Sequence, residues 1–362
     1  MTATSIDLWG PFLVALVVAA AVAPLSIKIA PKIGAMDIPK DERRMHSKAM
    51  PRFGGMAIFA GVIITLILFA HGDKEIMSIM TGCIFIYAIG VVDDLKTLKP
   101  MIKLVGQIAC ALLLYVQGIK IEFVTNYLGD GNMIFGDVAC MLITVIWVVA
   151  ITNAVNLIDG LDGLAAGTSA ISALCIGYVA YIHGQYTTTF AMMVVAGAAL
   201  GFLPFNFHPA KTFMGDSGSQ LLGFSIAAFS IMGAVKSTTI VVVIIPALVL
   251  GLPIFDTLMA IVRRTMRRQS FATADKEHFH HRIMRAGYGQ KRSVMLMYCV
   301  SAIMGIVAVL YSRGYTVEYL GLLAVVAMLV YVLLSDTSNR NVNVRGSKIP
   351  NERRENKEKS RD

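Results

Sequence analysis

The chain has 362 residues, of which 56% are hydrophobic and 15% charged, and its formal net charge is +9. A soluble domain usually carries about 25% charged residues, so this composition excludes a disordered chain, a coiled coil and an ordinary soluble enzyme. The mean hydropathy of +0.68 indicates that lipid is the main solvent of the folded chain. All five cysteines lie in apolar runs without CxxC spacing, which predicts neither a disulfide framework nor a zinc site.

Apolar segments long enough to cross a membrane recur along the chain. Crossing the hydrocarbon core of a bilayer takes about 20 apolar residues in a helix, and fewer where helices pack on one another. The first segment lacks a basic n-region and continues through Pro24, which is typical of a permanent helix rather than a cleaved signal peptide. We expect an all-α polytopic membrane protein with eleven transmembrane helices, near residues 8–29, 54–70, 76–92, 101–117, 139–157, 164–182, 189–206, 218–235, 239–262, 294–312 and 317–335.

The positions of Lys and Arg predict how these helices are oriented. Basic residues favour cytoplasmic connections. Placing residues 30–53 in the cytoplasm leaves only four of the 32 basic residues outside, namely Lys74, Lys120, Lys236 and Arg313. We therefore expect the N-terminus outside and the C-terminus in the cytoplasm. The excess of basic residues then reflects topology, and it gives no indication of nucleic-acid binding.

One integral membrane domain is expected over residues 1–337. The clustered carboxylates fall on its cytoplasmic side, so we expect the active site to be built from cytoplasmic loops near 30–53, 93–100, 157–163, 207–217 and 263–293. Residues 338–362 are polar and dense in both charge signs, with no apolar periodicity. This pattern predicts a flexible charged cytoplasmic tail that is attracted to anionic lipid headgroups.

Asp93 and Asp94 are the first candidates for chemistry. Two adjacent carboxylates at the end of an otherwise apolar segment are costly near lipid and are usually functional. Like charges side by side raise the proton affinity of one carboxylate, which suits a general base or a cation site. The alternative is the solvated start of a loop. Lys103 and the lysines before it could face an anionic substrate, or they could be ordinary cytoplasmic-side residues.

A second cluster follows the fifth expected helix, in the sequence Asn-Ala-Val-Asn-Leu-Ile-Asp-Gly-Leu-Asp-Gly. On a continuing helix Asn153 and Asn156 would share a face, and so would Asp159 and Asp162. Asp-Gly pairs also form turns, so a simple helix-ending loop is the alternative. A loop accounts for the glycines but not for two asparagines in an apolar run, where an unpaired amide is costly. The pattern therefore favours a binding role.

Asp216 lies among glycines and hydroxyl residues in the sequence Phe-Met-Gly-Asp-Ser-Gly-Ser, just before the eighth expected helix. A carboxylate in such a position suits a hard cation, while backbone N–H groups at a helix start can receive phosphate. In the alternative interpretation, Asp216 or Ser217 merely caps the helix.

A fourth cluster, in the longest cytoplasmic loop, contains His278, His280, His281 and Arg282. Structural zinc is not indicated, because two of the histidines are adjacent and no cysteine accompanies them. With several arginines nearby, donors to phosphate or sugar oxygens are the better interpretation. A basic amphipathic loop on the membrane is the alternative, and it leaves the histidines unexplained.

These parts together are those that phosphoryl transfer uses: a cation ligand, cationic donors that neutralise phosphate charge, and a carboxylate for the proton of the nucleophile. In their order along the chain, from Pro51-Arg-Phe-Gly-Gly55 to Arg282, the motifs resemble the polyprenyl-phosphate N-acetylhexosamine-1-phosphate transferase family, which is glycosyltransferase family 4. Eleven spans with an outside N-terminus are also similar to that family. Phe279 interrupts the histidines, which resembles the branch that uses UDP-GlcNAc.

The resemblance implies an enzyme that depends on Mg²⁺, with Mn²⁺ as an alternative ion. It would transfer GlcNAc-1-phosphate from UDP-GlcNAc to undecaprenyl phosphate, giving undecaprenyl-diphospho-GlcNAc and UMP. It would act at the cytoplasmic face of a bacterial plasma membrane, as the first membrane step towards wall teichoic acid or a related envelope polysaccharide such as O-antigen. By analogy with the family, a homodimer is expected.

The same resemblance implies roles for individual residues. Asp216 would be the metal ligand, and Asp93 or Asp94 the base that deprotonates the lipid phosphate. Substrate binding would fall to Asn153, Asn156, Asp159, Asp162, Lys103, His278, His280, His281 and Arg282. Direct attack by the lipid phosphate and a two-step route through an aspartyl-phosphate both agree with the sequence. We favour direct attack, because a phosphate needs little activation as a nucleophile.

Two other functions compete with this interpretation. The nearer one is the same chemistry with UDP-MurNAc-pentapeptide as the donor. The more distant one is a multi-pass transporter, which would place its binding groups near the bilayer midplane, often in two related halves. The carboxylates of this chain instead cluster at one face, and its halves show no similarity.

Overall fold

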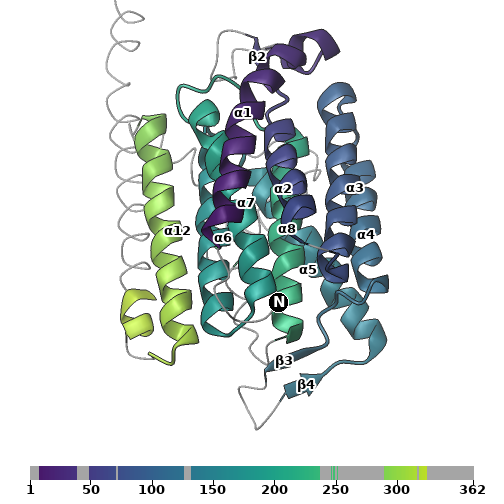
Figure 1. The fold of residues 1–362 in the computed structure, drawn as a ribbon, viewed down its shortest axis with the longest axis vertical. Coiled ribbons are helices and arrows are strands. Elements are labelled where there is room, and N and C mark those ends of the chain that lie inside the picture. The colour runs from purple at the N-terminus through teal and green to yellow at the C-terminus, as the bar shows by residue number, and fades with distance from the viewer. Residues whose placement is uncertain are drawn as a thin grey trace, which may run out of the picture.

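The computed structural model describes residues 8–38, 49–70, 72–125, 132–236, 289–315 and 318–323, together with positions 246, 248 and 251. Within these ranges the chain forms a bundle of helices that run roughly along one direction (Figure 1). The helices are α1 Trp9–Ile33, α2 Gly55–Phe69, α3 Lys74–Lys96, α4 Pro100–Val116, α5 Asp137–Ile158, α6 Leu164–Ile182, α7 Tyr186–Asn206, α8 Gly215–Lys236 and α12 Gln290–Ser312. Two antiparallel ribbons pair β1 Met36–Asp37 with β2 Met50–Pro51 and β3 Phe123–Thr125 with β4 Asn132–Ile134.

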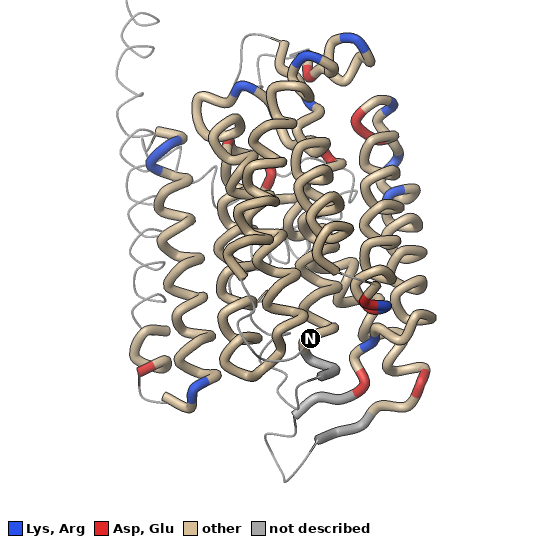
Figure 2. The backbone as a smooth tube through the Cα atoms, viewed as in Figure 1, with Lys and Arg blue, Asp and Glu red and all other residues tan. Residues whose placement is uncertain are grey.

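Six of the described helices, α1, α3, α5, α6, α7 and α12, are long and apolar enough to cross a membrane. Helices α2 and α4 are also apolar but shorter, with 15 and 17 residues. Charged residues gather towards the two ends of the bundle, and the zone between them is largely free of them (Figure 2). This distribution matches a bilayer, whose hydrocarbon core disfavours charge, and confirms an essentially α-helical, multi-pass membrane protein.

Nine of the eleven expected segments coincide with helices in the described ranges. The expected segments 239–262 and 317–335 lie wholly or mostly outside the described residues, as do the loop 263–293 up to position 288 and the tail 338–362. The total of eleven spans and the orientation of the termini therefore stay predictions.

The helix ends differ from the expected loops in ways that matter for the site. Helix α3 continues to Lys96, so Asp93 and Asp94 lie in its last turn rather than in a loop over 93–100. Helix α8 begins at Gly215, so Asp216 lies in its first turn rather than in a loop over 207–217. Helix α5 ends at Ile158, so Asp159 and Asp162 do not share a helical face. The two ribbons were not expected, because each of their strands is only two or three residues long.

Helix α8 lies in the middle of the bundle, against α2, α3, α5, α6 and α7 (Figure 1). Glycines on the neighbouring helices allow this close packing. A Cβ on Gly90 would lie 2.4 Å from the Cα of Ser217, and a Cβ on Gly55 would lie 2.4 Å from the backbone N of Gly218. Close backbone approach through small residues is the usual way in which helices pack within a bilayer. It brings the ends of α2 and α3 to the first turn of α8.

The two ribbons lie at opposite ends of the bundle (Figure 1). The β1–β2 ribbon belongs to the loop between α1 and α2, and the β3–β4 ribbon to the loop between α4 and α5. Backbone hydrogen bonds join the first of these loops to the one before α8: the N–H of Phe213 donates to Pro51 O, and the N–H of Gly54 donates to Phe213 O. The described parts of two expected cytoplasmic loops, 30–53 and 207–217, thus meet at one end of the bundle.

Candidate active site

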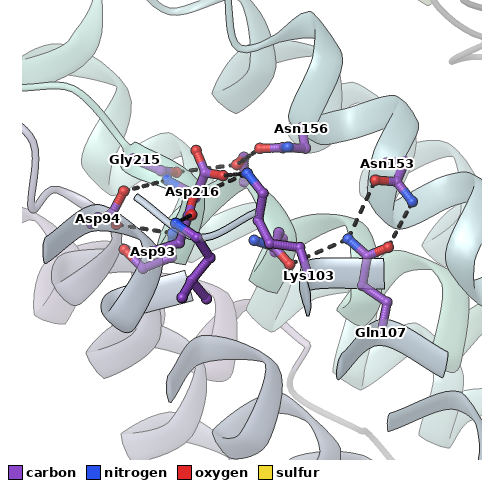
Figure 3. Close-up of polar contacts among 12 residues, drawn as sticks. Asp93, Asp94, Lys103, Gln107, Asn153, Asn156, Gly215 and Asp216 are labelled. Atoms are coloured by element: carbon purple, nitrogen blue, oxygen red, sulfur yellow. Dashed lines mark hydrogen bonds and ion pairs between the residues drawn. The ribbon is translucent and has the colours of Figure 1, made fainter. Parts of the chain in front are cut away.

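An array of alternating charges, which we call the ionic layer, lies where the end of α3 and the starts of α4 and α8 meet (Figure 3). It consists of Arg52, Asp93, Asp94, Lys103 and Asp216. Lys103 joins two of the carboxylates, since its Nζ lies 3.0 Å from Asp93 Oδ2 and 2.6 Å from Asp216 Oδ2. Residues that are far apart in the sequence thus form one network.

Asp94 differs from its neighbour Asp93 in what it contacts. Its two carboxylate oxygens accept the backbone N–H groups of Asp216 and Ser217, at 2.8 and 3.0 Å, and its side chain is fully buried. Asp94 therefore caps α8 from another helix and lies where the helix dipole favours a negative charge. Gly215, at φ +73°, opens this helix, and a Cβ there would lie 2.6 Å from Asp94 Oδ2.

Asp93 instead faces the cations. Its Oδ2 accepts from Lys103, and its Oδ1 accepts the backbone N–H of Leu98 at 2.6 Å, just beyond the end of α3. The ammonium of Lys103 thus lies directly beside the carboxylate of Asp93. Asp94 thus accepts two backbone N–H groups of α8, whereas Asp93 accepts one backbone N–H group and the ammonium of Lys103.

Arg52 is a member of the ionic layer that the sequence interpretation did not single out. Its Nη2 lies 2.5 Å from Asp216 Oδ1, and its Nε lies 3.3 Å from Asp94 Oδ1. The sequence motif Pro51-Arg-Phe-Gly-Gly55 contained it, but only as part of the resemblance. The available signal was a single Arg two positions before a pair of glycines, and positive-inside counting gives such a residue no individual role.

Beside the ionic layer lies a second group of polar side chains, which we call the amide layer: Gln107, Asn153 and Gln220 (Figure 3). Gln107 Nε2 donates to Asn153 Oδ1 and to Gln220 Oε1, both at 3.3 Å, and Asn153 Nδ2 donates to Gln107 Oε1 at 2.6 Å. Gln107 and Gln220 are buried. Gln107 lies four positions from Lys103 on α4, and Gln220 lies four positions from Asp216 on α8. Asn153 lies three positions from Asn156 on α5. Because its amide contacts protein groups, the geometry favours a positioning role for Asn153.

Asn156 lies next to the ionic layer, where its Oδ1 accepts from Ser219 Oγ at 2.7 Å (Figure 3). Ser219 also donates to Gly215 O, at 3.1 Å, in the first turn of α8. Asn153 and Asn156 thus share a face of α5 as predicted, but they contact different layers.

The turn after α5 fixes Asp162 and leaves Asp159 near the ionic layer. Asp162 Oδ2 accepts from His208 Nδ1 at 2.8 Å and from the backbone N–H of Ala210 at 3.2 Å, which ties this turn to the loop after α7. Burial raises the pKa of Asp159 well above its usual range; the negative charge of Asp216 adds to this effect and Arg52 opposes it. The charges of Asp216 and Arg52 thus affect the pKa of Asp159.

The predicted histidine cluster, His278, His280, His281 and Arg282, lies outside the described residues. Within the described ranges, no group of three or more His, Cys, Asp or Glu side chains has the geometry of a metal cage. Mg²⁺ is commonly held by only one or two carboxylates together with substrate phosphates. The hard oxygen donors of Asp216 and Asn156 suit that kind of site.

Comparison with known proteins shows which family the chain resembles. The family model described as glycosyl transferase family 4 matches residues 76–234, a stretch that runs from α3 to α8. The chain is 38% identical over 299 residues to a probable undecaprenyl-phosphate N-acetylglucosaminyl 1-phosphate transferase of Bacillus subtilis, with 82% of this chain and 83% of that protein covered.

Two further relatives come from other bacterial groups. The chain is 35% identical over 338 residues to a decaprenyl-phosphate N-acetylglucosaminephosphotransferase of Mycolicibacterium smegmatis, covering 84% of this chain and 83% of that protein. It is 27% identical over 316 residues to an undecaprenyl-phosphate alpha-N-acetylglucosaminyl 1-phosphate transferase of Escherichia coli, covering 85% and 83% respectively.

Proposed function

Because the chain belongs to the polyprenyl-phosphate N-acetylglucosamine-1-phosphate transferase family, we propose that it transfers GlcNAc-1-phosphate from UDP-GlcNAc to undecaprenyl phosphate. The products are undecaprenyl-diphospho-GlcNAc and UMP. The observation that carries this proposal is the position of Asp216, at the start of a central helix between the cations of Arg52 and Lys103. Such a site can hold a phosphate-bound cation and neutralise a diphosphate.

Mg²⁺, or Mn²⁺ in its place, is the proposed cofactor, and Asp216 is its proposed protein ligand. The carboxamide oxygen of Asn156 lies beside the same helix turn and is a further candidate ligand. When bound, the ion supplies a positive charge that stabilises the phosphate oxygens as charge moves onto the leaving UMP. The cations of Lys103 and Arg52 add positive charge on either side of Asp216.

Asp93 is the proposed base. An oxygen of the lipid phosphate attacks the β-phosphorus of UDP-GlcNAc, and the bond between that phosphorus and the bridging oxygen of UMP breaks. Asp93 accepts the proton of the lipid phosphate, and the ion pair with Lys103 holds the carboxylate of Asp93 in position. Asp94 is the less suitable base, because both of its oxygens accept backbone N–H groups of α8. The remaining predicted residues, Asp159, Asp162 and the histidine cluster, are proposed to bind the nucleotide and the sugar diphosphate.

We place the site at the cytoplasmic face of a bacterial plasma membrane, at the end of the bundle that carries the β1–β2 ribbon. The nucleotide donor is water-soluble, and the phosphate of the lipid lies at headgroup level, so helix ends at that face meet both substrates. Wall teichoic acid or a related envelope polysaccharide is the proposed destination of the product, and a homodimer is the proposed assembly.

The donor is tested by incubating the purified protein with undecaprenyl phosphate, Mg²⁺ and one UDP-sugar at a time, and measuring UMP. UDP-GlcNAc should release UMP, whereas UDP-MurNAc-pentapeptide and UDP-GalNAc should release little. Omitting the lipid should abolish UMP release. UMP release from UDP-MurNAc-pentapeptide alone would assign the chain to the other donor, and lipid-independent UMP release would argue against direct attack.

A further inference from the structure

Arg52 occupies the position from which it can compete with a metal ion. We propose that Arg52 is a placeholder cation: it neutralises Asp216 before substrates bind, gives up that contact when the metal ion arrives, and then binds the diphosphate of the nucleotide. Metal binding and nucleotide binding would thereby be coupled. This inference rests on the proposed role of Asp216 as the metal ligand.

The first step of the argument concerns the two oxygens of Asp216. Oδ1 contacts Arg52 Nη2 at 2.5 Å, and Oδ2 contacts Lys103 Nζ at 2.6 Å, so each oxygen already has its own cation. A divalent ion needs at least one carboxylate oxygen at short range. Each carboxylate oxygen keeps a second lone pair, but a cation beside it repels a divalent ion, so Asp216 binds the ion weakly until one of the two ion pairs opens.

Of the two cations, Arg52 is more exposed and has the weaker second contact. Its side chain is 32% exposed, compared with 23% for Lys103. Lys103 also contacts Asp93 at 3.0 Å, whereas the second contact of Arg52, with Asp94, is longer at 3.3 Å. Asp94 in addition keeps two backbone N–H donors of α8 when Arg52 leaves. The ion pair between Arg52 and Asp216 is thus the one that opens at lower cost.

The backbone around Arg52 limits the movement to its side chain. Its own N–H donates to Ala35 O at 2.9 Å, and the residue before it accepts the N–H of Phe213 at 2.8 Å. The Cα of Arg52 is thus fixed between two loops, while the partly exposed guanidinium can change partners. A guanidinium presents parallel N–H donors that match two phosphate oxygens, so a diphosphate arriving from the aqueous side is a suitable new partner.

The consequence is a thermodynamic coupling between metal and nucleotide. Without nucleotide, the ion competes with Arg52 for Asp216 and binds weakly. With a diphosphate present, the guanidinium has another anion to bind, and the metal affinity rises. Because coupling is reciprocal, the metal strengthens nucleotide binding by the same factor.

The test measures Mn²⁺ binding to the purified full-length protein in detergent, by the loss of the free-ion paramagnetic resonance signal, with and without UDP. A protein-free titration corrects for binding of Mn²⁺ by UDP itself. For the unmodified protein, UDP should tighten Mn²⁺ binding by about tenfold. Arg52→Gln should bind Mn²⁺ about tenfold more tightly without UDP, and the effect of UDP should fall to about twofold or less.

Two further variants keep the test sharp. Arg52→Lys retains the charge without the planar donor pair, so it should keep the weak Mn²⁺ binding without UDP but lose part of the effect of UDP. Arg313→Gln makes the same change at an exposed residue at the end of α12, whose guanidinium lies over the ring of Tyr178, and it should match the unmodified protein. Circular dichroism shows whether each variant keeps its helices. If Arg52→Gln does not fold, the comparison of Arg52→Lys with the unmodified protein, with and without UDP, decides the test.

The outcomes separate this inference from the proposed function. Equal Mn²⁺ affinity in the unmodified protein and Arg52→Gln, with the UDP effect unchanged, overturns the placeholder role of Arg52 and leaves the metal role of Asp216 standing. Unchanged Mn²⁺ binding in Asp216→Asn, in the presence of UDP, overturns the metal role itself and this inference with it.

Discussion

The ionic layer and the amide layer both use residues of α4 and α8, but they differ in charge and in burial. The ionic layer carries formal charges, and its cations are partly exposed, so its contacts can be exchanged for substrate and metal. The amide layer is neutral and largely buried, and its side chains mainly satisfy one another. We therefore propose that the exchangeable charges of the ionic layer supply the chemistry, while the neutral hydrogen bonds of the amide layer hold the helices that carry those charges in register.

The strongest test of the ionic layer is Asp216→Asn. It removes the proposed metal ligand and the shared partner of both cations, so UMP release should fall by about a thousandfold or more, and excess Mg²⁺ should not restore it. A fixed-time assay of UMP over a range of Mg²⁺ concentrations measures this effect. Near-normal turnover in this variant would remove Asp216 from the metal role.

Asp93→Asn should reduce kcat by about a hundredfold to a thousandfold, because the base is lost while the helices stay in place. The midpoint of thermal unfolding should change little. Steady-state kinetics with a thermal melt of the same preparation provide both numbers. A large loss of stability with normal kcat would assign Asp93 to the scaffold instead.

Asp94→Asn is the matched variant at the adjacent position, and its effect should fall mainly on stability. An asparagine offers only one acceptor to two buried N–H groups at the start of α8, and its NH₂ would face the other donor. Leaving a buried N–H unpaired costs about 1–3 kcal/mol. A lower unfolding midpoint with residual kcat above that of Asp93→Asn is expected, and the reverse order would exchange the two roles.

The amide layer is tested by Gln107→Leu. Asn153 and Gln220 then lose a partner in a buried region, which should cost about 1–3 kcal/mol of stability. The kcat should fall by only about tenfold, since Lys103 keeps its own charge. In the double variant Gln107→Leu with Asn153→Leu, two of the paired groups are removed together, so part of the stability should return. Simple addition of the two single effects would show that these amides are not coupled.

The smallest expected effect concerns pH. A carboxyl group with a raised pKa in the folded protein, such as Asp159, holds its proton there while the unfolded chain ionises. Its contribution to stability is therefore lost as the pH rises from about 4, the ordinary value for Asp, through the folded pKa. The unfolding midpoint of the unmodified protein, minus that of Asp159→Asn, should decline across this range. A difference independent of pH would contradict the raised pKa.

The sequence predicted the membrane-spanning elements well where the signal is local. Length and apolar composition located nine of the expected segments, and acidic residues in apolar surroundings marked Asp93, Asp94 and Asp216. Both signals come from the cost of placing charge in hydrocarbon, which does not depend on the tertiary fold.

The contacts that the sequence did not predict depend on which helices approach one another. Gln107 and Gln220 are ordinary single amides until α4 and α8 come together, and Asp94 caps a helix that begins 121 residues later. The packing that decides these contacts uses Gly55 and Gly90, whose roles appear only when the backbone of α8 lies beside them. Arg52 was counted as a topological charge for the same reason.

The central claim, transfer of a sugar together with its phosphate, is tested most directly with doubly labelled UDP-GlcNAc. The donor carries ³²P in its β-phosphate and ³H in the GlcNAc, and the purified protein receives it with undecaprenyl phosphate. We expect both labels to enter the lipid fraction in equal molar amounts, with unlabelled UMP released. Tritium in the lipid without ³²P, accompanied by labelled UDP, would show transfer of the sugar alone and contradict the account.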